Sequence, residues 1–247
     1  MSAPLFLLPK GCLSGVEAGA ALHLDGEEGR HAAVVTRLQP GEPVLLGDGS
    51  GALAQCTVTA VAKASLEATV ATITHEPVSD PRFTLIQALA KGDRDLLAIE
   101  IGTELGLDEV LPWQADRSIV RWRGDRAVKG QRKWAQTLVA ATKQARRARV
   151  PQLGDLADRH TVTDRITAAE LAVVLHEEAT EPLAEVTLPE HGEVLMVVGP
   201  EGGITPDELA AFTQAGAQSV RLGATVLRTS TAGSAAIAVL SAQARWR

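Results

Sequence analysis

The stretch Glu193–Ala236 decides the fold of this chain: EVLMVVGPEGGITPDELAAFTQAGAQSVRLGATVLRTSTAGSAA. It opens with an unbroken apolar run, Val194–Val198, which is typical of a strand covered on both faces of a sheet. A glycine-rich turn, Gly199–Gly203, then interrupts the run. We therefore expect a buried parallel strand that ends in a loop.

A capped helix is predicted after this turn. Thr205 suits the N-cap because its side-chain oxygen can accept a hydrogen bond from the first turn, and Pro206 suits the first helical position. Glu208 completes a capping box, and Gly216 provides a left-handed stop. The segment Ser219–Leu222 predicts a second, short strand.

A loop, Gly223–Arg228, and an alanine-rich helix, Thr231–Ala244, follow. Both glycine-rich loops thus come after parallel strands at their carboxyl ends, where open α/β sheets place their ligands. The run Gly199–Gly203 lacks the G-x-G-x-x-G spacing of dinucleotide-binding loops, and no Lys-Ser/Thr follows it as in a Walker A loop. The residues predict a doubly wound α/β domain with a pocket made largely of backbone.

Two motifs in this stretch carry a resemblance to a known family. GPEGGITPDE at 199–208 and LGATVLRTSTA at 222–232 resemble the signature pair of the bacterial 16S (small-subunit) ribosomal RNA uridine-N3 methyltransferases of the SPOUT class. The resemblance implies an N-terminal PUA-like β-barrel that binds RNA, at residues 1–73, and a C-terminal SPOUT α/β domain with a trefoil knot, at residues 74–247. It also implies S-adenosylmethionine as the cofactor, the small ribosomal subunit as the partner, and a homodimer that completes the pocket.

Composition sets broader limits. With 247 residues, 45% of them hydrophobic, the chain can bury one large core or two smaller ones. No apolar run approaches the roughly 20 residues of a membrane span, and the N-terminus is too short for a signal peptide, so we expect a cytoplasmic protein. The two cysteines, Cys12 and Cys56, form no C-x-x-C motif and have no histidine at a spacing typical of metal ligands, so we expect neither a metal site nor a disulfide framework.

The net charge of −6 conceals a local basic region. Residues 117–150 contain 11 Lys or Arg and one acidic residue, Asp125, which gives a local charge of +10 and leaves −16 on the rest of the chain. Such an asymmetry favours a nucleic-acid-binding face over the alternative, an ordinary solvated helix face. Aromatic residues make up only 3% of the chain, which disfavours a base-stacking platform of the RRM type.

The rest of the chain fits two domains. In the first we expect a short helix at Glu27–Leu38 and strands at Leu5–Leu8, Val44–Gly47, Ala52–Val61 and Leu66–Ile73. The segment RHAAVVTRLQPGE at 30–42 loosely resembles an RNA-binding segment of the family. The polar, proline-bearing stretch His75–Pro81 predicts a linker.

In the second domain the apolar periodicity predicts four more elements ahead of Glu193. They are strands at Phe83–Ala90, Asp108–Gln114 and Leu171–Leu175, and a helix at Arg94–Gly106 with Leu97, Ile101 and Leu105 on one face. A basic helix is expected at Gln131–Arg147, where Trp134 and Leu138 lie near one stripe.

The resemblance also names site residues. In the family the loop after Leu175 is the first of three that line the cofactor pocket, and the other two lie in the opening stretch. The expected cofactor-binding residues are Leu175, His176, Val198, Gly199, Gly203, Leu222, Gly223, Val226, Leu227 and Ala232. The expected RNA-binding residues are Arg30, Arg37, Lys91, Arg117, Arg121, Lys143 and Arg147.

Methyl transfer from a sulfonium needs alignment, exclusion of water and a uracil N3 that can lose its proton, but no protein nucleophile and no metal. Arg228 is the first catalytic candidate, because a fixed cation beside the uracil oxygens stabilises the enolate. A phosphate or structural contact is its alternative role. Glu201 is the nearest carboxylate for a base, although an acid before a helix N-terminus also suits the helix dipole. Ser230 stands where the family commonly has a glutamate, which indicates that this glutamate is not the base, or that another group acts here.

Two other functions stay open. A sister SPOUT enzyme that methylates a ribose 2′-oxygen or another base would share the pocket, and the modified nucleoside distinguishes it. A non-catalytic RNA-binding or ribosome-assembly protein is the second alternative, which a failure to bind the cofactor would favour.

Overall fold

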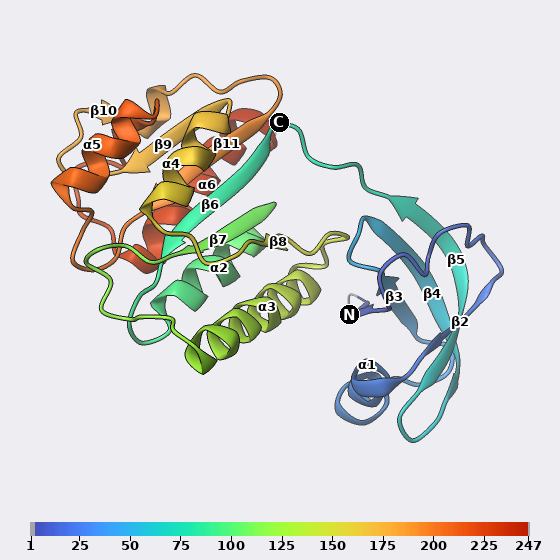
Figure 1. The fold of residues 1–247 in the computed structure, drawn as a ribbon. Coiled ribbons are helices and arrows are strands. Elements are labelled where there is room, and N and C mark those ends of the chain that lie inside the picture. Colours follow the sequence, from blue (N-terminus) through green and yellow to red (C-terminus); the bar gives the residue numbers. More distant parts are fainter. Residues whose placement is uncertain (1–2, 247) are drawn as a thin grey trace. The chain divides into compact units, whose positions relative to one another are not determined.

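The computed structural model describes residues 3–246, which divide into two compact units (Figure 1). The first unit contains the chain up to Val78 together with Thr142–Val150. The second contains Ser79–Ala141 and the chain from Pro151 on. Each unit has its own hydrophobic core.

The first unit is built on a five-stranded sheet with the order β1-β3-β4-β5-β2. Its strands are β1 (Leu5–Leu7), β2 (Ala21–Leu24), β3 (Pro43–Gly47), β4 (Ala52–Val61) and β5 (Leu66–His75). β1 runs parallel to β3, and the other pairs are antiparallel. Along β4 the side chains of Ala52, Ala54, Cys56 and Val58 alternate into the core, as expected for a sheet with one face solvated. The four predicted strands are confirmed, and β2 was not predicted.

The predicted helix at Glu27–Leu38 has two parts. An α-helix, α1 (Gly26–Arg30), continues as a π-helix, η1 (His31–Thr36), which ends at Arg37 in the left-handed region with φ of 59°. The segment Thr142–Val150 joins this unit through backbone hydrogen bonds, from Val150 N to Gly49 O (3.0 Å) and from Gly51 N to Ala148 O (3.0 Å). Because these bonds satisfy backbone groups of a connecting segment, that segment is part of the first unit.

The second unit contains a seven-stranded sheet with the order β10-β12-β9-β11-β6-β7-β8, and every pairing in it is parallel. Its strands are β6 (Arg82–Ala88), β7 (Glu109–Trp113), β8 (Gln152–Leu153), β9 (Leu171–Leu175), β10 (Glu181–Pro182), β11 (Glu193–Val198) and β12 (Gln218–Arg221). β11 is central, and all its residues after Glu193 are buried. The prediction of a strand covered on both faces is therefore confirmed.

The sheet has helices on both faces (Figure 1). They are α2 (Arg94–Glu104), α4 (Arg159–Ala168), α5 (Pro206–Gln214) and α6 (Thr229–Ala244), while α3 (Asp125–Ala145) begins in this unit and ends in the first; a short 3-10 helix is η2 (Leu183–Glu185). Val162 of α4 and Phe212 of α5 share one core with Leu195 of β11. On the other face α2 packs against α6. This arrangement confirms the predicted α/β class.

Three helices of this part of the chain differ from the sequence-based expectation. α3 begins at Asp125 and ends at Ala145, where a helix over Gln131–Arg147 was expected. α2 packs through Ala98 and Gly102, where a Cβ on Gly102 would lie 3.2 Å from Cδ1 of Ile237, while Leu97 on the expected apolar face is 43% exposed. α4 was not predicted, because it buries only Val162 and Ile166.

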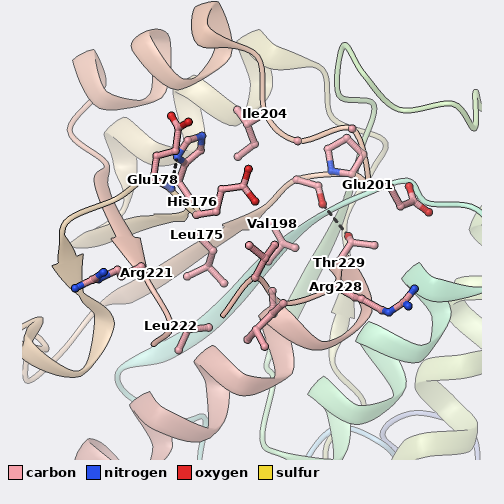
Figure 2. A pocket seen from close by; sticks show the side chains of 18 of the residues that line it. Leu175, His176, Glu178, Val198, Glu201, Ile204, Arg221, Leu222, Arg228 and Thr229 are labelled. Atoms are coloured by element: carbon pink, nitrogen blue, oxygen red, sulfur yellow. Dashed lines mark hydrogen bonds between the residues drawn. The ribbon is translucent and has the colours of Figure 1, made fainter. Parts of the chain in front are cut away.

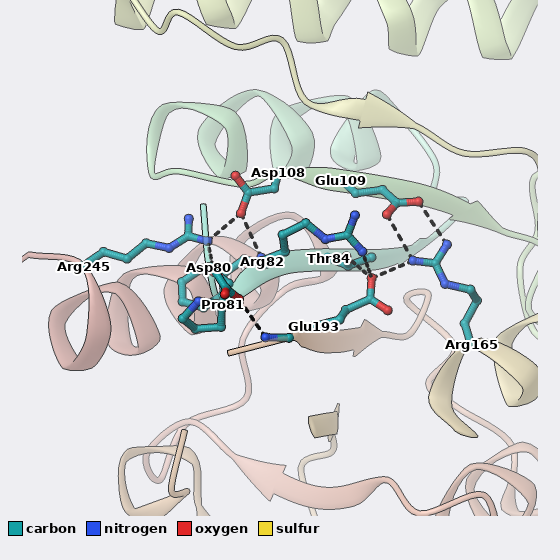
Figure 3. A network of polar contacts seen from close by, with 11 residues as sticks. Asp80, Pro81, Arg82, Thr84, Asp108, Glu109, Arg165, Glu193 and Arg245 are labelled. Carbon is teal, nitrogen blue, oxygen red and sulfur yellow. Dashed lines mark hydrogen bonds and ion pairs between the residues drawn. The ribbon is translucent and has the colours of Figure 1, made fainter. Parts of the chain in front are cut away.

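A polar network joins the amino ends of three strands in the second unit (Figure 3). Arg165 of α4 binds Glu109 with two hydrogen bonds (3.0 and 3.1 Å) and Glu193 with one (2.7 Å). Glu193 also accepts from Thr84 Oγ1 (2.6 Å) and Arg82 Nη2 (3.4 Å). Both carboxylates are only 12% exposed, and the two ion pairs raise the pKa of Arg165. The network therefore holds α4 to the edge of the sheet opposite the carboxyl ends of the strands.

We expect Arg165→Ala to lower the free energy of unfolding by about 2–3 kcal/mol, because it leaves two largely buried carboxylates short of their partner. Chemical denaturation followed by circular dichroism measures this loss. Arg82→Ala is the matched control: its side chain is 39% exposed and its contact is longer, so we expect a loss below about 1 kcal/mol. Equal losses in the two variants would contradict the central role of Arg165.

Candidate cofactor-binding and active site

A cavity of about 930 Å³ lies at the carboxyl ends of β9, β11 and β12 (Figure 2). Its volume is typical of small-molecule sites. All ten residues that the sequence predicts to bind the cofactor line it, and they come from three loops, the strand ends that precede two of them, and the first turn of α6. Both catalytic candidates, Arg228 and Glu201, line it as well. The predicted meeting of the loops at this edge of the sheet is confirmed.

The first loop follows β9. The N–H of His176 donates to the carbonyl of Val220 on β12 (2.9 Å), which extends the pairing of the two strands by one bond. The ring Nδ1 of His176 in turn accepts from the N–H of Glu178 (3.3 Å). These two bonds fold the loop back over the end of the sheet.

The second loop, Gly199–Gly203, follows β11 in a tight turn. Gly203 has a φ of 73°, a conformation that favours glycine, and its N–H donates to the carbonyl of Pro200 (2.9 Å). A Cβ on Gly199 would lie 2.7 Å from Cγ1 of Ile204, so only glycine fits there without displacing the loop. Glycine is therefore required at both ends of this tight turn, which lines the cavity.

Thr229 fastens this loop to the start of α6. Its hydroxyl donates to the carbonyl of Gly199 (2.7 Å; the dashed line at Thr229 in Figure 2) and accepts from Nε2 of Gln87 (2.9 Å). Gln87 is fully buried on β6, and its Nε2 also donates to Ala88 O (3.2 Å). Because the hydroxyl gives its proton to Gly199, the amide must offer its NH2 group, which fixes the orientation of Gln87.

The predicted cap of α5 is confirmed and has a second role. Thr205 Oγ1 accepts from the N–H of Glu208 (3.2 Å), and Oε2 of Glu208 accepts from the N–H of Thr205 (2.8 Å). The other oxygen of Glu208 accepts from the N–H of Asp116 (2.7 Å). The capping box therefore also fixes the segment that carries Arg117, which lines the cavity.

Arg228 stands at the N-cap of α6, where its carbonyl accepts from the N–H groups of Thr231 and Ala232 (both 2.9 Å). Its side chain is exposed, and within residues 3–246 it has no hydrogen bond or ion pair. The backbone of Arg228 is structural, whereas its guanidinium is available to a bound molecule.

Glu201 has a different environment. Its Oε1 accepts from Nη1 of Arg94 (2.7 Å) and from the N–H of Lys91 (3.0 Å). Burial alone raises the pKa of this carboxyl, but the hydrogen bonds from its own backbone, Arg94 and Lys91 outweigh burial and hold the pKa below its ordinary value. A carboxylate with a lowered pKa is a weak proton acceptor near neutral pH.

The seven predicted RNA-binding residues are divided between the two units. In the second unit, Arg117 donates to the carbonyl of Gly202 (3.1 Å), Arg121 donates to that of Asp116 (2.7 Å), and the Lys91 side chain is exposed. Of these three only Arg117 lines the cavity.

The other four residues belong to the first unit. Arg30 and Arg37 are exposed at either end of the π-helix. Lys143 forms an ion pair with Glu28 (2.5 Å) and lies 5.5 Å from the centre of the Phe6 ring, so part of its role is structural. Arg147 belongs to the segment Thr142–Val150 described above.

Sequence reasoning did not single out several residues of the site. Arg94 and Arg221 are among those that line the cavity, and Thr229 connects two of its loops. The carboxyl end of β6, which precedes Arg94, was a usable signal, because β6 neighbours β11 in the sheet. No local pattern pointed to the contact between Thr229 and Gly199.

Residues 3–246 contain neither a membrane-spanning helix nor a cluster of metal ligands. None of the helices in this range is both long enough and apolar enough to cross a membrane. In the same range, no three side chains of the His, Cys, Asp or Glu type gather where they could hold a metal ion.

Comparisons with known proteins agree with this geometry. Residues 78–241 match the family model of the RNA methyltransferase domain, and residues 24–71 match that of the RNA methyltransferase PUA domain. The chain is 45% identical over 235 residues to a Mycobacterium tuberculosis protein named ribosomal RNA small subunit methyltransferase E, covering 93% of this chain and 90% of that protein. A Bacillus subtilis protein of the same name is 30% identical over 237 residues, 92% of each chain.

A solved structure has the same fold over nearly the full length. It is the ribosomal RNA small subunit methyltransferase E from Neisseria gonorrhoeae bound to S-adenosyl methionine, with a TM-score of 0.85, 28% identity and coverage of 98% of both chains. The motifs of the two glycine-rich cavity loops indicated the same family as the two matched models, the related sequences and the shared fold. The chain belongs to the family of RNA methyltransferases with a PUA domain that includes the proteins named ribosomal RNA small subunit methyltransferase E.

Proposed function

We propose that this protein transfers a methyl group from S-adenosylmethionine to N3 of a uridine in the 16S RNA of the small ribosomal subunit. The observation that carries the proposal is the convergence of all ten predicted cofactor residues on one cavity. The name and bound cofactor of the Neisseria relative support it. The cavity fits this cofactor, because it combines backbone groups of glycine-rich loops with apolar side chains of Leu175, Val198 and Leu222.

When bound, S-adenosylmethionine supplies an activated methyl group on its sulfonium. The chain itself then has to bind, align and exclude water. Backbone groups of the three loops would hold the cofactor, and the apolar side chains around Leu222 would keep water from its methyl group. Methyl transfer requires that N3 of the acceptor uracil lose its proton.

Arg228 is the residue that we place beside the acceptor base. Its guanidinium has no competing partner within residues 3–246, so it can bind the uracil oxygens and stabilise the negative charge that grows as N3 loses its proton. Ser230, at the position where the family commonly has a glutamate, is only 4% exposed. The proton acceptor is therefore a group other than the side chain at this position.

The finer architecture is part of the same proposal. We propose that residues 1–73 form an RNA-binding PUA-like barrel and that residues 74–247 form the SPOUT domain with its trefoil knot. The order of the second sheet supports a threaded chain: β11 lies between β9 and β6, and after β12 on the far side of β9 the chain returns so that α6 packs against α2.

We also propose a homodimer that acts on the small ribosomal subunit in the cytoplasm. Exposed apolar side chains beside the cavity support a covering partner, since Val226 is 72% exposed and Leu227 is 36% exposed although both line the cavity. Sedimentation equilibrium measures the assembly directly.

The test is product analysis. Small subunits from cells that lack this enzyme are incubated with the protein and labelled S-adenosylmethionine, and the RNA is digested to nucleosides. We expect 3-methyluridine that depends on the protein. A label on a ribose 2′-oxygen or on another base would identify a sister methyltransferase instead. No labelled product, together with no calorimetric binding of the cofactor, would favour the non-catalytic RNA-binding or ribosome-assembly protein.

A further inference from the structure

Glu201 links two loops that are far apart in the sequence. It lies in the loop after β11, and its Oε1 accepts from Nη1 of Arg94, the first residue of α2 (2.7 Å), and from the N–H of Lys91 in the turn between β6 and α2 (3.0 Å). β6 and β11 are neighbours in the sheet, with Val198 opposite Gln87, so their loops leave it side by side. One carboxylate oxygen therefore fixes both the turn and the direction of the Arg94 side chain.

The turn that precedes Arg94 needs this support. Gly92 and Asp93 are both left-handed, with φ of 61° and 59°, a conformation that is costly at Asp93. Asp93 also pairs with Lys133 (2.7 Å), but both side chains are mostly exposed, so this ion pair contributes little. Glu201, with a side chain 25% exposed, is the better shielded partner.

Arg94 has a place in the site that no motif assigned to it. It lines the cavity, and its side chain is 39% exposed, which places it where the cavity meets solvent. Within residues 3–246 its only side-chain hydrogen bond is the one from Nη1 to Glu201. Its remaining N–H groups can therefore bind an anion at the opening.

The methyl acceptor brings such an anion. A base that enters the cavity draws the phosphates on either side of it over the rim, and the fork of a guanidinium matches a phosphate in geometry and charge. A lysine would provide only a point charge in this place, which makes the fixed orientation of Arg94 valuable.

We propose that Glu201 is a positioning residue: it holds Arg94 at the rim of the cavity, where Arg94 binds a phosphate of the RNA next to the target nucleotide. This inference rests on the proposed function and assigns Glu201 a role other than that of a base. Its paired oxygen and its low pKa both argue against proton transfer.

The test compares four variants: Arg94→Ala, Glu201→Ala, Glu201→Gln, and the double variant of the two alanine substitutions. Turnover on unmethylated small subunits is measured at saturating S-adenosylmethionine, and binding of purified 16S ribosomal RNA is measured over a range of KCl concentrations. Glu201→Gln removes the charge but keeps an oxygen that accepts both hydrogen bonds, whereas Glu201→Ala removes both.

We expect Arg94→Ala and Glu201→Ala each to raise KM by about tenfold with little change in kcat, and the double variant to be no worse than Arg94→Ala. Glu201→Gln should stay close to the wild type. Arg94→Ala should also flatten the salt dependence of RNA binding by about 0.7 in log–log slope, the contribution of one phosphate of a single strand.

Arg117→Ala is the matched control, because Arg117 lines the same cavity but binds the carbonyl of Gly202 instead of Glu201. Its effect should multiply with that of Glu201→Ala. If Glu201→Gln lost as much kcat as Glu201→Ala, the proposal would be overturned in favour of a base. If the effects of Arg94→Ala and Glu201→Ala multiplied, the two residues would act independently, which would also overturn the proposal. Calorimetry with S-adenosylmethionine distinguishes a failure of the proposed function from a failure of this inference. No binding to the wild type contradicts the proposed function, while intact binding in Glu201→Ala shows that the cofactor site is unchanged and that the RNA contact has changed.

Discussion

Arg228→Ala should lower kcat by about 10²–10³-fold and leave folding and cofactor binding unchanged, the loss expected when a fixed donor to a developing oxyanion is removed. The fold should survive because the structural contacts of Arg228 come from its carbonyl, and its side chain forms no cap on α6. Single-turnover methylation of small subunits measures the chemical step, and calorimetry measures the affinity for S-adenosylmethionine.

Arg221→Ala is the control for this substitution. Arg221 is also exposed and lines the same cavity, but Figure 2 shows it on the opposite side from Arg228. It should therefore retain most of the turnover, and Arg228→Lys, which keeps the charge without the planar fork, should recover only part of it. Full turnover in Arg228→Ala would remove this residue from the mechanism.

Gly223→Val should weaken the binding of S-adenosylmethionine by tenfold or more. Gly223 has a φ of 71°, in the left-handed region. A β-branched residue there costs about 1–2 kcal/mol or more in backbone strain. If the loop relaxes away from the cavity to relieve this strain, the affinity falls by roughly one order of magnitude. Calorimetric titration measures the change.

The control is Gly223→Asn, which adds a side chain of similar size but tolerates the left-handed conformation. A Cβ at this position meets nothing within 4 Å, so packing inside the chain does not distinguish the two variants. We expect Asn to bind the cofactor more tightly than Val. Equal loss in both would show that the side chain blocks the ligand and that backbone strain is not the cause.

The local features of the site were predictable from the sequence. The capping box of Thr205 and Glu208, the left-handed Gly216 and the fully buried run of β11 all follow from hydrogen bonds or packing demands within a few residues. The convergence of the glycine-rich loops was also predictable, because the carboxyl ends of parallel strands meet at one edge of a sheet.

Where the pattern was ambiguous, the prediction was incomplete. The apolar spacing of α2 predicted that the helix packs through the face with Leu97. It packs instead through Ala98 and Gly102, since small residues allow the close approach of α6. α4 was missed because only two of its residues, Val162 and Ile166, are both apolar and buried. The short strands β8 and β10 depend on pairing with neighbours more than on their own composition.

The sequence by itself determined the strand and helix nature of the opening stretch, the glycines of its turns and the candidate residues of three loops, because these depend on short-range sterics and hydrogen bonding. Only the tertiary structure decided that Arg94 pairs with Glu201, that Thr229 holds Gly199, and that Thr142–Val150 belongs to the first unit. Each of these contacts joins residues tens of positions apart. Their partners are chosen by the order of strands in the sheet, which no local pattern encodes.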